Sequence, residues 1–226
     1  MALPIINQPT YTITLPLSQK EVQCRQILAG EHKALLEAAS RKDDKVMGDT
    51  LIRVMQACTT GCSVASLEYP DAEYLFLRLY AIGIDNQLRM QCQCQECKTS
   101  FGITIPVADI MLDEVKEPPT IECGSGVSVK LKYPTFAMQQ AAKNDDALLY
   151  AMVDCVYDEH KTYTPGIDFS EDELKEFIDR LPASAVEQMI AFIEDMPAIE
   201  WARDLECPSC KAKGHLAYRG LSDFLA

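Results

Sequence analysis

Two short cysteine pairs limit what this chain can fold into. Cys94 and Cys97 form one C-x-x-C pair, Cys207 and Cys210 form the other, and 109 residues separate the two pairs. Each pair is followed by Lys and then by alternating apolar residues, which predicts a tight turn leading into a strand. Four thiolates from two such turns can surround one Zn²⁺ ion tetrahedrally, with Zn–S distances of about 2.3 Å. We therefore expect these four cysteines to be the ligands of a structural zinc ion in a ribbon interrupted by a long insertion.

Other interpretations of the cysteines compete with a zinc site. A redox C-x-x-C centre is typical of a thioredoxin-like βαβ context, which neither pair has, and simple burial of the thiols is the remaining alternative. Cys92 lies two residues before Cys94, so in an extended strand their side chains point to opposite faces. The second pair together with His215 begins like a nucleic-acid-binding zinc knuckle, but Gly220 stands where a fourth ligand would come. The sequence alone leaves open whether Cys92 or His215 takes the place of one of the four cysteine ligands.

The charge balance indicates which partners the chain can have. Its 226 residues contain 34 acidic and 21 basic side chains, a net charge of −13, with no long basic run. This balance disfavours phosphate backbones and anionic membranes and favours protein partners. There is no apolar run near the roughly 18 to 20 residues that cross a bilayer, and residues 1–14 lack the pattern of a signal peptide. With four of ten cysteines in metal spacing, a reducing cytoplasm is expected.

The rest of the sequence predicts an α+β fold that is mainly helical. Residues 1–87 are expected to form a short strand followed by a helical region. Residues 88–134 and 204–226 show the alternation and turn signals of hairpins, which predicts a small antiparallel sheet forming the split zinc ribbon. Residues 135–203 have apolar side chains at helical spacing and are expected to form a helical insertion.

Acidic and hydroxyl side chains mark several expected helix starts. Asp71 is expected to cap a helix over 72–82. Ser170 and Ser184 are each followed three residues later by Glu, the spacing of a capping box. Another helix is expected over 147–157.

Catalysis finds no support in the sequence. None of the three histidines lies near an obvious nucleophile, and the chain has no P-loop, dinucleotide fingerprint or nucleophile elbow. A zinc ion with four thiolate ligands has no open position for water, so it would stabilise the fold without taking part in a reaction. We expect a protein that is not an enzyme.

Several short stretches, read in order, resemble one known family. The stretches are Leu15-Pro16, Glu31-x-Lys33-x-Leu35-Leu36, Asp71-x-Glu73-x-Leu75-Phe76-Leu77, Ile82-Gly83, the Cys94 and Cys97 pair, Phe192-Ile193, Cys207-Pro208-x-Cys210 and Gly220-Leu221-x-Asp223-Phe224. Their order over most of the chain resembles the baseplate hub assembly protein family of T-even-like contractile-tailed bacteriophages. Lys211 departs from that pattern, because glycine is common at this position in the family.

The resemblance implies a role in building the central hub of a phage baseplate. It implies an assembly chaperone that contacts hub or tail proteins in the host cytoplasm or, as the alternative, a structural subunit retained in the tail baseplate of the virion. The hypothesis of another class is a zinc-ribbon protein that binds nucleic acid, which the acidic composition disfavours.

Overall fold

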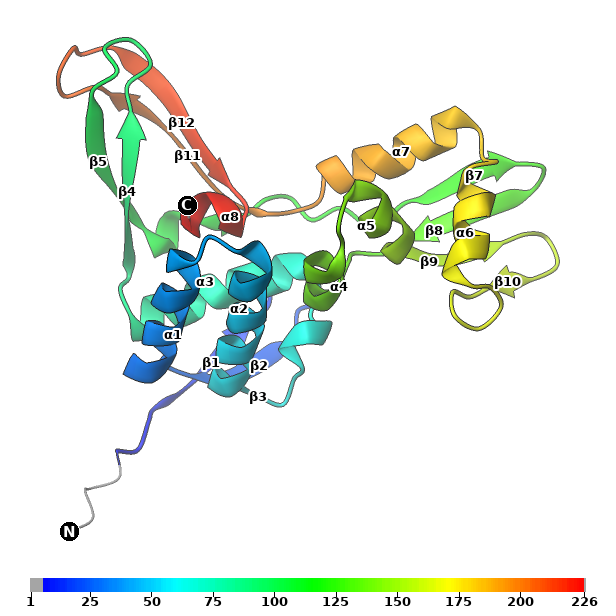
Figure 1. Cartoon of the computed structure of the whole chain (residues 1–226), viewed down its shortest axis with the longest axis horizontal. Helices are drawn as coiled ribbons and strands as arrows, with labels where there is room; N and C mark the ends of the chain where they lie inside the picture. Colours follow the sequence, from blue (N-terminus) through cyan, green and yellow to red (C-terminus); the bar gives the residue numbers. More distant parts are fainter. Residues whose placement is uncertain (1–5, 226) are drawn as a thin grey trace. The chain divides into compact units, whose positions relative to one another are not determined.

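The computed structural model describes residues 6–225, and the chain divides into two compact units (Figure 1). Unit 1 contains the chain up to Asp113 and again from Ala198 onward, and unit 2 is the intervening segment Glu114–Pro197. Unit 2 is therefore an insertion in the sequence of unit 1.

Unit 1 combines helices with three small antiparallel sheets, ordered β1-β2-β3, β4-β5 and β12-β11-β6. Its strands are β1 (Thr10–Thr14), β2 (Glu21–Arg25), β3 (Thr59–Thr60), β4 (Gln87–Gln93), β5 (Ser100–Pro106), β6 (Met111–Leu112), β11 (Ile199–Glu206) and β12 (Lys213–Arg219). Its helices are α1 (Ala29–Ser40), α2 (Asp44–Cys58), α3 (Tyr69–Gly83) and α8 (Leu221–Leu225), with 3-10 turns at Val64–Ser66 and Val107–Asp109.

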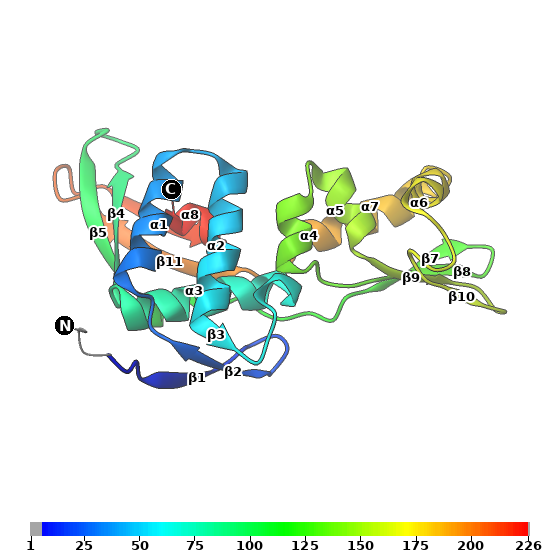
Figure 2. The ribbon, with the colours of Figure 1, turned by 60° about the horizontal axis from the view of Figure 1, so that its bottom comes forward.

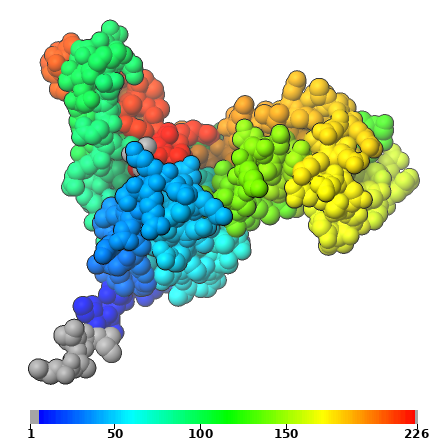
Figure 3. All heavy atoms as spheres, viewed as in Figure 1, coloured from blue at the N-terminus to red at the C-terminus, as the bar shows by residue number. Residues whose placement is uncertain are grey.

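Helices α1 and α2 pack side by side (Figure 2) and form part of one face of unit 1 (Figure 3). The side chain of Asp43 accepts a hydrogen bond from the Val46 N–H at 3.1 Å, which caps the start of α2. Leu51, Val54 and Met55 lie on one face of the helix, and all three are buried. The helical spacing of these apolar residues thus gives α2 one face that packs into the core.

Two buried carboxylates on α3 bind backbone groups from distant parts of unit 1. Asp71 accepts hydrogen bonds from the N–H groups of Leu17 and Ser18 at 2.8 and 2.9 Å, in the turn between β1 and β2. Glu73 accepts them from Leu221 and Ile199 at 2.7 and 3.5 Å, at the starts of α8 and β11. The expected capping role of Asp71 is wrong, because α3 begins two residues earlier and the carboxylate is needed by the β1–β2 turn.

The two ends of the insertion are joined within unit 1. Strand β6 pairs antiparallel with β11. Next to this pairing, the Asp113 N–H donates to the Ala198 carbonyl at 3.0 Å, and the Ala198 N–H donates to Asp113 Oδ1 at 2.7 Å. The Asp113 carboxylate also pairs with Arg219 at 3.1 Å. The chain thus leaves and re-enters unit 1 at adjacent positions.

Unit 2 contains one four-stranded antiparallel sheet, ordered β10-β9-β8-β7, and four helices. Its strands are β7 (Thr120–Gly124), β8 (Val127–Leu131), β9 (Val153–Tyr157) and β10 (Thr162–Tyr163), and its helices are α4 (Phe136–Ala141), α5 (Asp145–Ala151), α6 (Glu171–Ile178) and α7 (Ala183–Glu194). Its core includes Ile121, Val129, Phe136 and Met189, each at most 1% exposed.

The structure confirms the α+β class but not its mainly helical character, because helices hold 39% of the residues and strands 29%. The helix expected over 147–157 ends at Ala151, and the β-branched and aromatic residues after it pair with β8 as strand β9. The capping box at Ser170 is present, whereas α7 begins after Pro182 and Ser184 caps nothing.

The expected domain boundaries differ from the two units in two places. The hairpin β7–β8, expected in the ribbon segment 88–134, pairs with β9 and therefore lies in unit 2. The start of β11, expected in the insertion 135–203, pairs with β6 and lies in unit 1. Within residues 6–225, no helix combines the length and the apolar character needed to cross a membrane.

Replacing Glu73 tests the bonds that it accepts. Glu73→Ala leaves the buried Leu221 and Ile199 N–H groups without their acceptor, so the free energy of unfolding should fall by about 2–4 kcal/mol. Glu73→Gln keeps an acceptor oxygen and should cost less. Denaturant titration of the three proteins measures both effects.

The same variants should show a defined pH dependence. Burial raises the pKa of Glu73 above its ordinary value. Protonated Glu73 therefore stabilises the folded state. This stabilisation is complete at a pH below the pKa that Glu73 has in the unfolded chain, and it is lost as the pH rises through the pKa that Glu73 has in the folded protein. The free energy of unfolding of wild type should therefore fall relative to that of Glu73→Gln as the pH rises. A constant difference between about pH 4 and pH 8 would contradict this.

Candidate metal centre

The first cysteine pair forms the turn between β4 and β5. The Cys94 N–H donates to the Thr99 carbonyl, and the Lys98 N–H donates to the Cys94 carbonyl, each at 3.0 Å. The strands on either side pair from Gln87 with Pro106 to Gln93 with Ser100. The predicted tight turn leading into a strand is therefore present.

The second pair repeats this turn between β11 and β12. The Cys207 N–H donates to the Ala212 carbonyl at 2.9 Å, and the Lys211 N–H donates to the Cys207 carbonyl at 3.0 Å. The residue after the second cysteine is left-handed in both turns, with φ of 58° at Lys98 and 63° at Lys211. The two turns thus have the same local structure.

These turns bring the four sulfurs together in unit 1. Cys94 Sγ lies 3.7 Å from Cys210 Sγ, Cys97 Sγ lies 3.7 Å from Cys207 Sγ, and all four lie within 4.8 Å of one another. A regular ZnS₄ tetrahedron with Zn–S distances of about 2.3 Å has S···S edges of about 3.8 Å. The separations far exceed the about 2.05 Å of a disulfide, and all four thiols are free.

Hydrogen-bond donors around the cluster favour thiolates. The Thr99 hydroxyl, supported by its backbone N–H, lowers the pKa of Cys97 to about 6. The Cys210 backbone N–H lowers the pKa of Cys207. At Cys210 the Ala212 backbone N–H acts in the same direction, but the neighbouring cysteines prevail and raise its pKa to about 12.

The raised pKa of Cys210 reflects the closeness of the other three sulfurs. Four sulfurs at this separation cannot all carry negative charge unless a cation lies between them, since like charges this close repel strongly. The donor set is all sulfur, which suits Zn²⁺, and its geometry fits a tetrahedral ion. The four residues are therefore able to hold one zinc ion, in an arrangement of strands that is consistent with a zinc ribbon.

The other sulfur and nitrogen candidates lie outside the cluster. Among residues 6–225, the four cysteines are the one group of three or more His, Cys, Asp or Glu with ligand atoms this close. Cys92 Sγ donates to the Phe101 carbonyl at 3.4 Å, and His215 Nδ1 lies 2.9 Å from Asp204. Burial raises the pKa of Cys58 to about 12, which keeps that thiol protonated. Neither Cys92 nor His215 replaces one of the predicted ligands in the cluster.

Two contributions to the site did not follow from the cysteine spacing. The Thr99 hydroxyl contacts Cys97 Sγ at 3.3 Å, and the left-handed lysines close the two turns. The repeated Cys-x-x-Cys-Lys pattern was a usable signal for the lysine positions. No comparable sequence signal pointed to Thr99.

In a comparison with protein families, residues 8–226 match the family described as T4 bacteriophage base plate protein. The corresponding comparisons with curated proteins and with solved structures give no significant match.

The left-handed lysines can be tested by substitution with glycine. Lys98→Gly and Lys211→Gly relieve the steric cost of a side chain at positive φ, so each should raise the free energy of unfolding by about 0.5–1 kcal/mol. Lys213→Gly is the matched control, because Lys213 lies two residues further on in strand β12, where glycine weakens the strand. Thermal unfolding should show a higher Tm for the first two variants and a lower Tm for the control. The reverse order would exclude strain at the two turns.

Proposed function

This chain belongs to the T4 bacteriophage base plate protein family, and we propose that it is a non-enzymatic assembly factor for the central hub of a contractile tail baseplate. The observation that carries this proposal is the family match over residues 8–226. The role is that of a chaperone that contacts hub or tail proteins in the host cytoplasm while the baseplate is built.

The charge of the chain supports protein contacts as its mode of action. A net charge of −13 repels nucleic-acid phosphates and anionic lipid. Baseplate assembly requires specific binding between protein surfaces, and an acidic protein binds best to basic surfaces on its partners.

In this proposal a zinc ion has a structural role. Cys94, Cys97, Cys207 and Cys210 would hold it, and it would tie the β4–β5 hairpin to the β11–β12 hairpin at their turns. A structural zinc site supplies about 10–16 kcal/mol of apparent binding free energy, comparable with the stability of a whole domain. The ion would fix the fold of unit 1 so that its surface is presented in one conformation.

A second role within the same class is that of a subunit retained in the baseplate of the virion. The family description fits this role as well, because it speaks of a base plate protein without distinguishing an assembly factor from a retained subunit. The two roles share the protein contacts and differ in whether the chain stays in the finished particle.

The zinc proposal predicts the metal content of the purified protein. Metal analysis of freshly prepared full-length protein should give about one zinc ion per chain. The double variant Cys94→Ser/Cys207→Ser should lose it, whereas Cys92→Ser should keep it because Cys92 lies outside the cluster. Wild-type protein without zinc, or a double variant with its zinc retained, would exclude the site.

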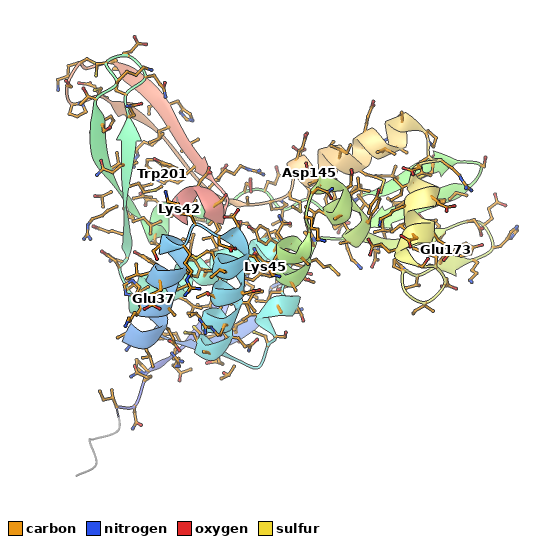
Figure 4. All side chains as sticks on the ribbon, viewed as in Figure 1. Glu37, Lys42, Lys45, Asp145, Glu173 and Trp201 are labelled. Atoms are coloured by element: carbon orange, nitrogen blue, oxygen red, sulfur yellow. The ribbon has the colours of Figure 1, made fainter. Side chains whose placement is uncertain are left out.

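Loss of the metal should destabilise unit 1. Trp201, the only tryptophan in the sequence, lies 5% exposed on β11 and reports on this unit (Figure 4). Chelation, or the double variant, should shift its emission to the red and lower the midpoint of its unfolding transition. The amides of the β7–β10 sheet should keep their protection from hydrogen exchange, because unit 2 has its own core.

The assembly role predicts a defined defect in phage production. Infection with a phage that lacks this gene product should yield no complete baseplates, and supplying the wild-type protein in trans should restore them. The Cys94→Ser/Cys207→Ser variant should fail to restore them, whereas Cys92→Ser should succeed. Mass spectrometry of purified tails separates the two roles, since only a retained subunit stays in the particle. Normal baseplates without the protein would exclude both roles.

A further inference from the structure

Unit 2 contains two apolar hollows that are both lined by Phe169 and Leu174, here together called the Phe169 groove. One side is a hollow of about 300 Å³, and the other is a hollow of about 410 Å³. Phe169 and Leu174 line both hollows. The first is otherwise lined mainly by Val127, Val156, Tyr157, Tyr163 and Phe177. The second is lined mainly by Met138, Ala141, Ala147, Tyr150 and Pro165.

Apolar side chains remain accessible in and beside this groove. Phe169, Phe177 and Tyr150 are only half-buried. Ile167, in the loop that contributes Pro165 to the lining, is 83% exposed. Exposed apolar side chains beside apolar hollows are typical of a surface that another molecule covers.

The surroundings of the groove are strongly acidic. Segment Glu114–Pro197 contains 17 Asp and Glu against 7 Lys and Arg, so unit 2 carries a net charge of −10 out of −13 for the chain. The helices beside the groove carry part of this excess, with Asp145 and Asp146 in the first turn of α5 and Glu171, Asp172 and Glu173 in the first turn of α6. Figure 4 shows Asp145 on α5 and Glu173 on α6.

Two basic residues, Lys143 and Lys175, lie near these five acids and are too few to neutralise them. Lys175 lies 3.2 Å from Glu171 and 3.6 Å from Asp172, so one cation serves two carboxylates. Asp145 and Asp146 are both exposed. A molecule that enters the groove therefore meets an apolar floor and an excess of negative charge at the rim.

From these features we infer that the Phe169 groove binds a basic segment of a partner protein, with one or two large apolar side chains flanked by Lys or Arg. The apolar anchors enter the hollows beside Phe169, and the basic flanks lie against the acids of α5 and α6. The inference rests on the proposed function and names the chemistry of the partner. A second copy of unit 2 is a poor occupant, because two surfaces of this charge repel each other.

A peptide selection on the full-length protein tests the inference. A displayed library of random 12-residue peptides is selected on the wild-type chain, and binders that also recognise Ala141→Trp are removed. Ala141 is exposed and lines the second hollow, so a tryptophan there should block that hollow without entering the core. The recovered peptides should combine Lys or Arg with Leu, Phe, Met or Trp. Recovery of acidic or purely polar peptides, or of none, overturns the inference.

Matched variants locate the binding. A fluorescein-labelled copy of the best peptide is titrated by anisotropy. Its Kd should rise about tenfold or more on Ala141→Trp and when its apolar anchors are replaced by Ser. Glu171→Lys should weaken binding several-fold, with a larger loss at low salt than at high salt. Ala191→Trp and Glu187→Lys are exposed changes on α7 of the same unit, outside the groove, and should leave the Kd unchanged. Equal effects of groove and control variants overturn the inference.

Two further measurements separate the remaining outcomes. Self-association of the wild-type chain in sedimentation, abolished by Ala141→Trp, would assign the groove to a second copy and overturn the inference. Baseplate formation with Ala141→Trp supplied in trans tests the partner role. Normal baseplates with this variant would overturn the groove as a partner site and leave the proposed function intact. Normal baseplates without the protein would instead exclude the proposed function itself.

Discussion

Helix α3 holds unit 1 together through two carboxylates that are nearly inaccessible to water. Asp71 and Glu73 are 0% and 1% exposed. One binds the turn after β1, and the other binds the starts of β11 and α8, so segments from both ends of the chain meet on one helix. Buried backbone N–H groups need acceptors, and these side chains supply them where regular pairing does not. Glu73 thereby holds the start of β11, the strand that leads to Cys207 and Cys210.

Most of the local signals in the sequence were informative, although the capping signals at Asp71 and Ser184 were not. The cysteine turns were predictable because each is specified by a few adjacent residues, and the structure adds that both turns have the same hydrogen bonds. The capping box at Ser170 was predictable for the same reason. Where tertiary pairing decides, the prediction was wrong, because Val153–Tyr157 is apolar enough for either a helix or a strand and becomes a strand beside β8.

The buried carboxylates could not be assigned from the sequence. Asp71 lies close to the start of a helix, where a capping role is the usual interpretation, and nothing in its neighbourhood indicates a partner 54 positions earlier in the chain. The Phe169 groove was equally hidden, since its lining comes from strands, helices and a loop that are separate in the sequence. Both features arise from contacts between distant segments, which residue spacing does not encode.

The division of unit 1 into two sequence segments has a consequence for synthesis on the ribosome. Cys97 and Cys207 are 110 positions apart, so at about 5–20 residues per second the first pair of thiols waits roughly 5 to 20 seconds for the second. All of unit 2 is made during this interval and can fold before unit 1 closes. A zinc ion held by all four thiolates therefore requires a chain translated beyond Cys210. A chain that ends before this residue would lack the complete set of ligands.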